Sequence, residues 1–158
     1  MRNLTRSWLA AAVLSLAYTS IGCAHVSGRQ LGEAERNALV SYYVEHQPKD
    51  GRHLEKQIAD SLHSRGLEVS SGPAEDRPER VDYIVSYVDR WRWDLRMYLY
   101  DLRIEVLDAA TGHVVGSGQS IQPSLSAMGM TFRDVIDRAV AVLFEGPIAR
   151  TIGQTAPE

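Results

Sequence analysis

The segment from residue 81 to residue 122 constrains the fold of this chain more than any other part of it. Its sequence, VDYIVSYVDRWRWDLRMYLYDLRIEVLDAATGHVVGSGQSIQ, is rich in aromatic and β-branched residues that alternate with polar ones. That alternation predicts β-strands with two different faces. A turn is expected near Asp94 and Leu95, and the DAATGH sequence at 108–113 predicts another. The segment therefore predicts three consecutive antiparallel strands.

The apolar positions predict how the first two of these strands face. If the loop between them has an even number of residues, the numbers of directly opposed residues sum to an odd number. In that register two apolar sets share one face with Asp89, and a slip of one residue would mix them with Arg and Asp. The sets are Tyr83, Val85, Tyr87, Trp91 and Trp93 in the first strand, and Tyr98, Tyr100, Leu102, Ile104 and Val106 in the second.

The opposite face is expected to be charged with an apolar centre. An apolar centre inside a charged rim is common in protein interfaces, so this face is a candidate for binding a partner. A ladder of cross-strand charge pairs is the alternative interpretation. The residues predicted for this partner face are Val88, Arg90, Arg92, Met97, Leu99, Asp101 and Arg103.

Two amphipathic helices are expected beside the strands. Leu54, Ile58 and Leu62 recur every four residues over 52–65, with Asp50 as a candidate N-cap. A second apolar stripe over 132–143 follows an approximate capping box and ends before Gly-Pro at 146–147. With strands at 38–46 and 67–70, the order is β-α-β-β-β-β-α. This order predicts an α+β two-layer sandwich, a mixed and mostly antiparallel sheet with two helices on one face.

The first 23 residues have the layout of a secretory signal. Arg2 and Arg6 precede the apolar run WLAAAVLSLA at 8–17, which is too short to span a membrane comfortably. The sequence SIGC at 20–23, which holds the only cysteine, resembles the lipobox of bacterial lipoproteins. That resemblance implies cleavage between Gly22 and Cys23 and a lipid on the Cys23 thiol as the membrane anchor. Ala24 resembles the sorting signal for the outer membrane.

Four segments are expected along the chain. They are a signal peptide at 1–22, a lipidated tether at 23–37, a globular domain at 38–147 and a flexible tail at 148–158. The mature protein is expected to face the periplasm from the membrane.

The W-x-W-D-L sequence at 91–95 and the D-x-x-T-G turn at 108–112 resemble a family of small uncharacterised Gram-negative lipoproteins. The resemblance covers about residues 38–146, and the family has no activity that could be transferred to particular residues. The order of elements is also similar to that of the amino-terminal domain of the periplasmic component of the Tol-Pal system. That second resemblance implies a role through protein contacts.

Composition and motifs argue against several kinds of function. The net charge of −3 disfavours a general nucleic-acid binder, because phosphate recognition needs clustered Lys and Arg. One cysteine excludes an internal disulfide framework and a cysteine-based zinc site. The five histidines show no metal-ligand spacing, and Asp89 with Asp101 is the only weak candidate for a carboxylate pair. We therefore expect no enzyme activity, no cofactor and no metal.

The leading hypothesis is a non-catalytic lipid-anchored protein that binds an envelope protein and supports envelope assembly or integrity. The alternative is a carrier of a lipid or glycan, with a cavity between sheet and helices or with exposed aromatic residues. Trp91 and Trp93 could form such an aromatic platform, although packing beneath the helices is the simpler expectation for Trp91.

Overall fold

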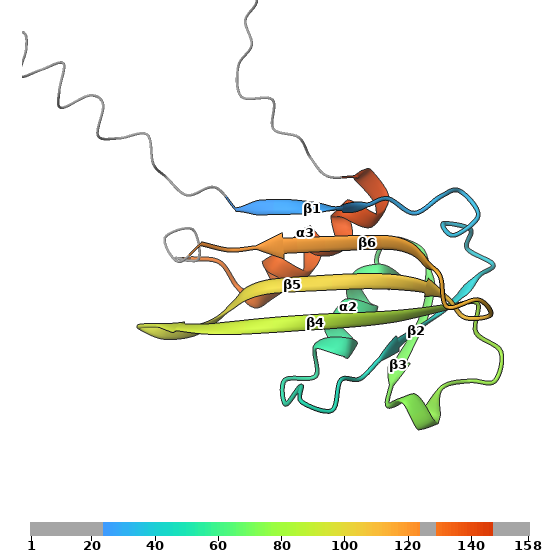
Figure 1. Ribbon diagram of the computed structural model, residues 1–158, viewed down its shortest axis with the longest axis horizontal. Coiled ribbons are helices and arrows are strands. Elements are labelled where there is room, and N and C mark those ends of the chain that lie inside the picture. Colours follow the sequence, from blue (N-terminus) through green and yellow to red (C-terminus); the bar gives the residue numbers. More distant parts are fainter. Residues whose placement is uncertain (1–23, 124–128, 147–158) are drawn as a thin grey trace, which may run out of the picture.

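The computed structural model describes residues 24–123 and 129–146. In this part of the chain, one six-stranded sheet carries two helices on one face (Figure 1). This architecture confirms the predicted α+β two-layer fold. The strands are β1 (His25–Arg29), β2 (Ser41–Glu45), β3 (Glu68–Gly72), β4 (Tyr83–Asp94), β5 (Arg96–Asp108) and β6 (Val114–Ile121). The helices are α2 (Leu54–His63), α3 (Phe132–Glu145) and the short 3-10 helix η2 (Ala74–Asp76).

The strand order is β1-β6-β5-β4-β2-β3, which makes the sheet mixed. The pairs β1–β6, β6–β5 and β5–β4 are antiparallel, whereas β2 is parallel to both β3 and β4. A parallel neighbour requires a crossover, and α2 supplies it between β2 and β3. The predicted mostly antiparallel character is therefore confirmed for the long strands.

The N-terminal segment differs from the expected tether. Residues 25–29 form the edge strand β1, in which Gly28 lies opposite Gly118 of β6. Gly28 has a φ of 151°, and a Cβ there would overlap the backbone carbonyl of Ser117. Beyond the strand, Leu31 is buried and its N–H donates to the Leu143 carbonyl at 2.8 Å. The folded body therefore begins at His25. The expected signal peptide and tail lie outside the described residues.

Both helices lie close to the predicted ranges, but the N-cap residue of α2 is His53 and not the expected Asp50, whose carboxylate reaches the first helical N–H from further back in the chain. α2 begins at Leu54, whose N–H donates to the Asp50 carboxylate at 2.6 Å, and Gly66 follows the helix with a φ of 89°. In α3 the side chain of Thr131 accepts from the Asp134 N–H while the Asp134 carboxylate accepts from the Thr131 N–H. These caps satisfy N–H groups that a helix leaves without partners in its first turn.

The β4–β5 register confirms part of the prediction and corrects the rest. From Tyr83↔Asp108 to Arg90↔Asp101 the opposed numbers sum to an odd number, as expected. A bulge then makes Trp91 oppose Leu99, and the turn has one residue, Leu95, with a φ of 58°. An extra residue in a bulge reverses the facing of the residues beyond it. The expected even-numbered loop and the facing assigned to residues 97–100 were therefore wrong.

The core lies between the sheet and the helices. β6 contributes small residues here, because Gly116 and Gly118 face Leu143 and Ala139 of α3. Among the described residues no helix is long and apolar enough to cross a membrane. The core includes Tyr42, Val44, Leu54, Ile58, Leu62, Val85, Tyr87, Leu99, Leu102, Ile104, Val106, Ile136, Val140 and Leu143.

Candidate functional site

The predicted partner face is only partly assembled. Val88 is 58% exposed, and Arg90, Arg92 and Arg103 are exposed beside it. Leu99 is 1% exposed and packs in the core, because the bulge turns it toward the helices. The prediction that Leu99 belongs to the partner face was therefore wrong. The predicted lipid site, Gly22 and Cys23, lies outside the described residues.

Two further members of the predicted face lie differently from what alternation suggests. Met97 is 46% exposed but opposes Trp93, so it belongs to the side of the sheet that carries the helices. Asp101 lies on the predicted face but is buried, accepting a hydrogen bond from Gln119 at 2.9 Å. It also lies 3.8 Å from the Arg90 guanidinium.

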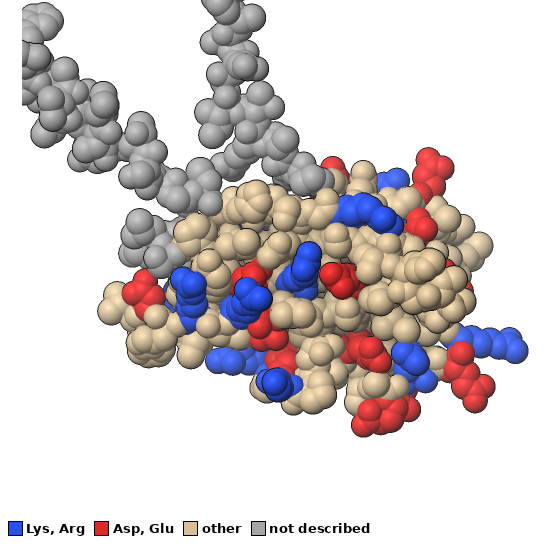
Figure 2. Space-filling view, in the orientation of Figure 1, with Lys and Arg blue, Asp and Glu red and all other residues tan. Residues whose placement is uncertain are grey.

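Paired charges cover the open face of the sheet. Besides the Arg90–Asp101 contact, Arg103 and Glu105 lie 3.5 Å apart, and the Arg92 guanidinium stacks 3.8 Å from the centre of the Tyr100 ring. Figure 2 shows positive and negative side chains intermingled on this side of the molecule. Exposed pairs of this kind each contribute little to stability. Of these contacts only Arg90–Asp101 is an ion pair between two strands, because Arg103 and Glu105 both belong to β5.

The end of the β4–β5 hairpin exposes a separate group of apolar side chains. Trp93 is 72% exposed, Leu95 is 94% exposed and Met97 is 46% exposed. We call these three residues the apolar hairpin end. Figure 1 shows this part of the hairpin extending beyond the end of β6. Large apolar residues grouped on a protruding element are a common feature of binding surfaces.

A cavity of about 250 Å³ lies at the base of the apolar hairpin end. Trp91, Met97, Leu99, Phe132 and Val135 contribute apolar walls to it. The Trp91 indole N–H donates to the Asp89 carboxylate at 2.6 Å, and the Trp91 and Phe132 rings lie 6.3 Å apart. The hydrogen-bond partner of the Asp89 carboxylate is thus a tryptophan. Asp89 also lies on the opposite side of the sheet from Asp101.

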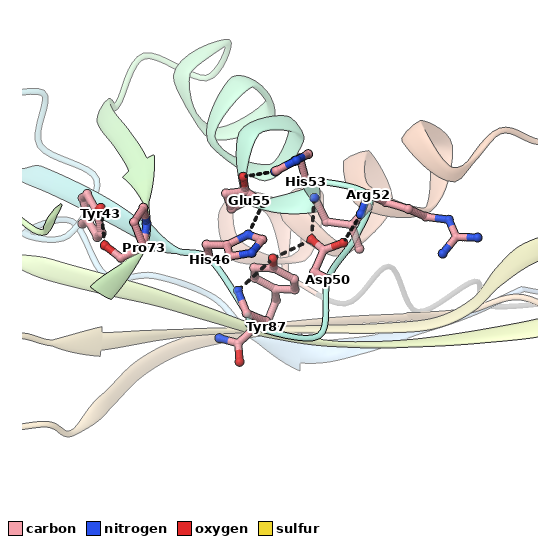
Figure 3. A network of polar contacts seen from close by, with 10 residues as sticks. Tyr43, His46, Asp50, Arg52, His53, Glu55, Pro73 and Tyr87 are labelled. Carbon is pink, nitrogen blue, oxygen red and sulfur yellow. Dashed lines mark hydrogen bonds and ion pairs between the residues drawn. The ribbon is translucent and has the colours of Figure 1, made fainter. Parts of the chain in front are cut away.

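Three side chains of types that can bind a metal ion meet where β2 leads into α2 (Figure 3). His46 Nδ1 lies 3.0 Å from one carboxylate oxygen of Glu55, and His53 Nδ1 lies 3.1 Å from the other. The two imidazole rings stack with centroids 5.6 Å apart. Glu55 is 2% exposed, whereas the His53 side chain is 62% exposed and faces solvent. We call these three residues the His-Glu-His cluster.

The Asp50 carboxylate lies beside this cluster and is also buried. It accepts hydrogen bonds from the Tyr87 hydroxyl at 2.7 Å, the Arg52 N–H at 2.8 Å and the Leu54 N–H. Burial alone would raise the pKa of Asp50, but these donors and the nearby His46 hold that pKa below its ordinary value. Burial and the bond to Asp50 raise the pKa of Tyr87. Asp50 is therefore a carboxylate that folding keeps ionised.

The Glu55 carboxylate has the same balance of effects. Burial opposes its ionisation, yet the imidazoles of His46 and His53 lower the pKa of Glu55 below its ordinary value. An ionised carboxylate only accepts hydrogen bonds, so in the absence of a bound cation each imidazole would present a protonated Nδ1 to it. Sequence reasoning missed this cluster because the two histidines are seven positions apart in the sequence and a loop brings them together. The one available signal was H-x-E at 53–55, directly at a predicted helix start.

Comparison with known proteins supports the fold and nothing finer. No family model matches the chain, and no curated protein matches it. Two structures of the PelC dodecamer from Paraburkholderia phytofirmans, one of them a single-residue variant, align with TM-scores of 0.55 and 0.54. Both are 18% identical to this chain, and each alignment covers 75% of it and 95% or 96% of PelC.

A third match, to TolB from Acinetobacter baumannii, has 12% identity and a TM-score of 0.39. It covers 75% of this chain and 31% of TolB, a distant similarity at the level of the fold. The resemblance to a family of small lipoproteins stays a prediction.

Proposed function

We propose that this chain is a non-catalytic envelope protein, held at the outer membrane by a lipid on Cys23, that binds another envelope protein from the periplasmic side. The observation that carries this proposal is the apolar hairpin end, with Leu95 at 94% exposure at its turn. Such a partner would link the anchored domain to other envelope components and so support envelope assembly or integrity.

The hairpin end has the composition expected of a docking surface. Tryptophan and methionine are enriched in the centres of interfaces, and Trp93 and Met97 are paired directly across the hairpin. Asp94 and Arg96 flank the turn and supply a charged rim. Burying the exposed part of Trp93 alone would contribute on the order of 2 kcal/mol to association. The proposed docking surface is therefore this end of the hairpin, while Val88 and the arginines lie on the opposite, open face of the sheet.

Photo-crosslinking in living cells tests the docking surface. A probe at Leu95 is expected to give a discrete crosslinked band, because this side chain would lie inside the interface. Leu39 is the matched control, since it is an exposed leucine (87%) far along the chain from the hairpin, and the exposed Lys56 on α2 is a second control. A band of twice the chain's mass would identify a second copy as the partner; the PelC structures of similar fold are dodecamers. Equal or absent crosslinking at all three positions would contradict the proposal.

Removal of the lipid anchor is expected to abolish membrane association. Cys23→Ser is expected to move the protein from the membrane fraction to the soluble fraction, because each buried CH₂ of an acyl chain contributes about 0.8 kcal/mol to membrane binding. Fractionation of cell lysates with an immunoblot measures this, and Ala24→Ser, which keeps the thiol, serves as the control. A Cys23→Ser protein that stays with the membrane would refute lipid anchoring.

The cavity at the base of the hairpin favours the second candidate function, binding of a small lipid or glycan. Its volume of about 250 Å³ is below the usual range for drug-sized ligands, and Trp91 and Phe132 offer aromatic walls to one ring or a short chain. Native mass spectrometry of protein purified from cells separates the two functions. A retained small molecule that Phe132→Ala releases would favour the carrier.

A further inference from the structure

We propose that the His-Glu-His cluster binds a divalent transition-metal ion, with Zn²⁺ as the best-fitting one. His46, His53 and Glu55 would each supply one ligand atom, and water would complete the coordination. This site is independent of the hairpin and of the lipid anchor.

The three ligand types are those of a transition-metal site. Two imidazoles and one carboxylate form a donor set found at zinc sites with an open position, and imidazole also suits copper and nickel. Calcium and magnesium prefer oxygen ligands throughout, so a cluster with two histidines disfavours them. The chemistry of the cluster therefore selects a transition metal.

The distances between the ligand atoms fit a single bound ion. The ligand atoms of the three residues all lie within 4.8 Å of one another. Zn²⁺ with ligand distances of about 2.1 Å in tetrahedral geometry separates its ligand atoms by about 3.4 Å. The two imidazole-to-carboxylate distances, 3.0 Å to one oxygen of Glu55 and 3.1 Å to the other, are close to that value, and a bound ion would displace the protons that lie along them. The exposed His53 side chain has room to turn, so the required adjustment is small.

The surroundings of the cluster also favour a bound cation. Glu55 is held in the first turn of α2 with almost no solvent contact, and His46 is held just after β2 by the bond from its N–H to the Gly72 carbonyl at 2.8 Å. Asp50 adds a second buried carboxylate next to His46. A cation bound to the cluster would thus lie near two negative charges, with ligands on two packed elements. The solvent-exposed His53 leaves the cluster accessible to an ion from outside.

The alternative is that the cluster is structural only, with both imidazoles donating to Glu55 and fastening the loop between β2 and α2. The two interpretations differ in a direct observable. A metal site binds one Zn²⁺ per chain, and with Co²⁺ in its place it gives an absorption spectrum typical of nitrogen and oxygen ligands. A structural cluster does neither.

The proposal is tested by measuring the zinc affinity of the full chain, purified in detergent and stripped of metal. The affinity is measured by competition with a chromophoric chelator. We expect one Zn²⁺ per chain, binding at least about tenfold weaker in His53→Ala or Glu55→Gln, and no stoichiometric binding in the His46→Ala/His53→Ala double variant. His63→Ala and His113→Ala are the matched controls and should bind as the parent does. Added Co²⁺ should give a ligand-field spectrum that the double variant lacks.

Circular dichroism and the Tm of each metal-free variant distinguish lost metal binding from lost folding. Glu55→Gln is the conservative variant, because the amide oxygen still accepts a hydrogen bond from an imidazole. Absence of stoichiometric Zn²⁺ binding by the folded parent chain would overturn the proposal. Equal zinc affinity of the parent and a folded double variant would overturn it as well.

Discussion

Gly118→Val is expected to prevent the domain from folding, and Gly118→Ala to lower its free energy of unfolding by about 3 kcal/mol or more. A Cβ at Gly118 would overlap the carbonyl oxygen of Ala139 in α3 and lie 3.0 Å from its carbonyl carbon and 3.5 Å from Val142 Cβ. The obstacle is helix backbone, which cannot turn aside as a flexible side chain does. The helix would have to move away from β6, with loss of the packing of its whole buried face.

Chemical denaturation followed by circular dichroism measures this effect, and Gly51→Ala is the matched control. A Cβ at Gly51 meets nothing within 4 Å, so this change should leave stability within about 0.5 kcal/mol of the parent. A loss of about 3 kcal/mol corresponds to a fall in Tm of roughly 10 °C for a domain of this size. If Gly118→Ala were as stable as Gly51→Ala, the contact of α3 with β6 described above would be wrong.

The close approach at Gly118 also shows what the sequence could and could not predict. Gly116 and Gly118 leave room for a close neighbour on this strand, but local alternation cannot say which element that neighbour is. The answer depends on α3, whose stripe was predicted correctly but whose position on β6 is a tertiary property. Periodicity and capping predicted the elements because both effects act within a few residues.

Two features of the hairpin escaped prediction for a physical reason. Alternation predicts which face of the sheet each side chain lies on by assuming that the side changes at every residue. The bulge after Arg90 shifts this alternation by one residue. Leu99 therefore packs in the core although alternation assigned it to the partner face, and Met97 lies on the same side of the sheet as Leu99. The β1 strand was missed because HVSGR has a glycine and only one β-branched apolar residue, so its pairing comes from the facing β6 strand.

The His-Glu-His cluster escaped prediction because it depends on loop geometry. A helical zinc motif brings ligands together at a spacing of three or four residues, which a sequence shows directly. Here His46 ends a strand, His53 precedes a helix, and the loop between them sets their separation. The left-handed backbone of His53, with a φ of 55°, was also not predictable from the sequence.

Asp50→Ala is expected to lower the free energy of unfolding by about 3 kcal/mol at neutral pH. The change removes the carboxylate that accepts the Leu54 N–H at the start of α2, and loss of such a cap costs about 1 kcal/mol. It also leaves the hydroxyl of Tyr87, a residue only 2% exposed, without its acceptor, which costs a further 1–3 kcal/mol or so. Tyr87→Phe keeps the ring and the cap, so it should cost about 1 kcal/mol. Urea denaturation of the three proteins measures these differences.

The acid dependence of this difference tests whether Asp50 acts as an ion. Since folding lowers its pKa, its contribution is present above the ordinary aspartate value of 3.8 and is lost as pH falls through the lower folded value. The gap in stability between the parent and Asp50→Ala should therefore be constant near neutral pH and shrink below about pH 4. Asp60→Ala removes an exposed carboxylate of α2 and should cost less than about 1 kcal/mol. A gap that grows in acid would mean that Asp50 is protonated in the folded protein, because only a raised pKa gives that sign.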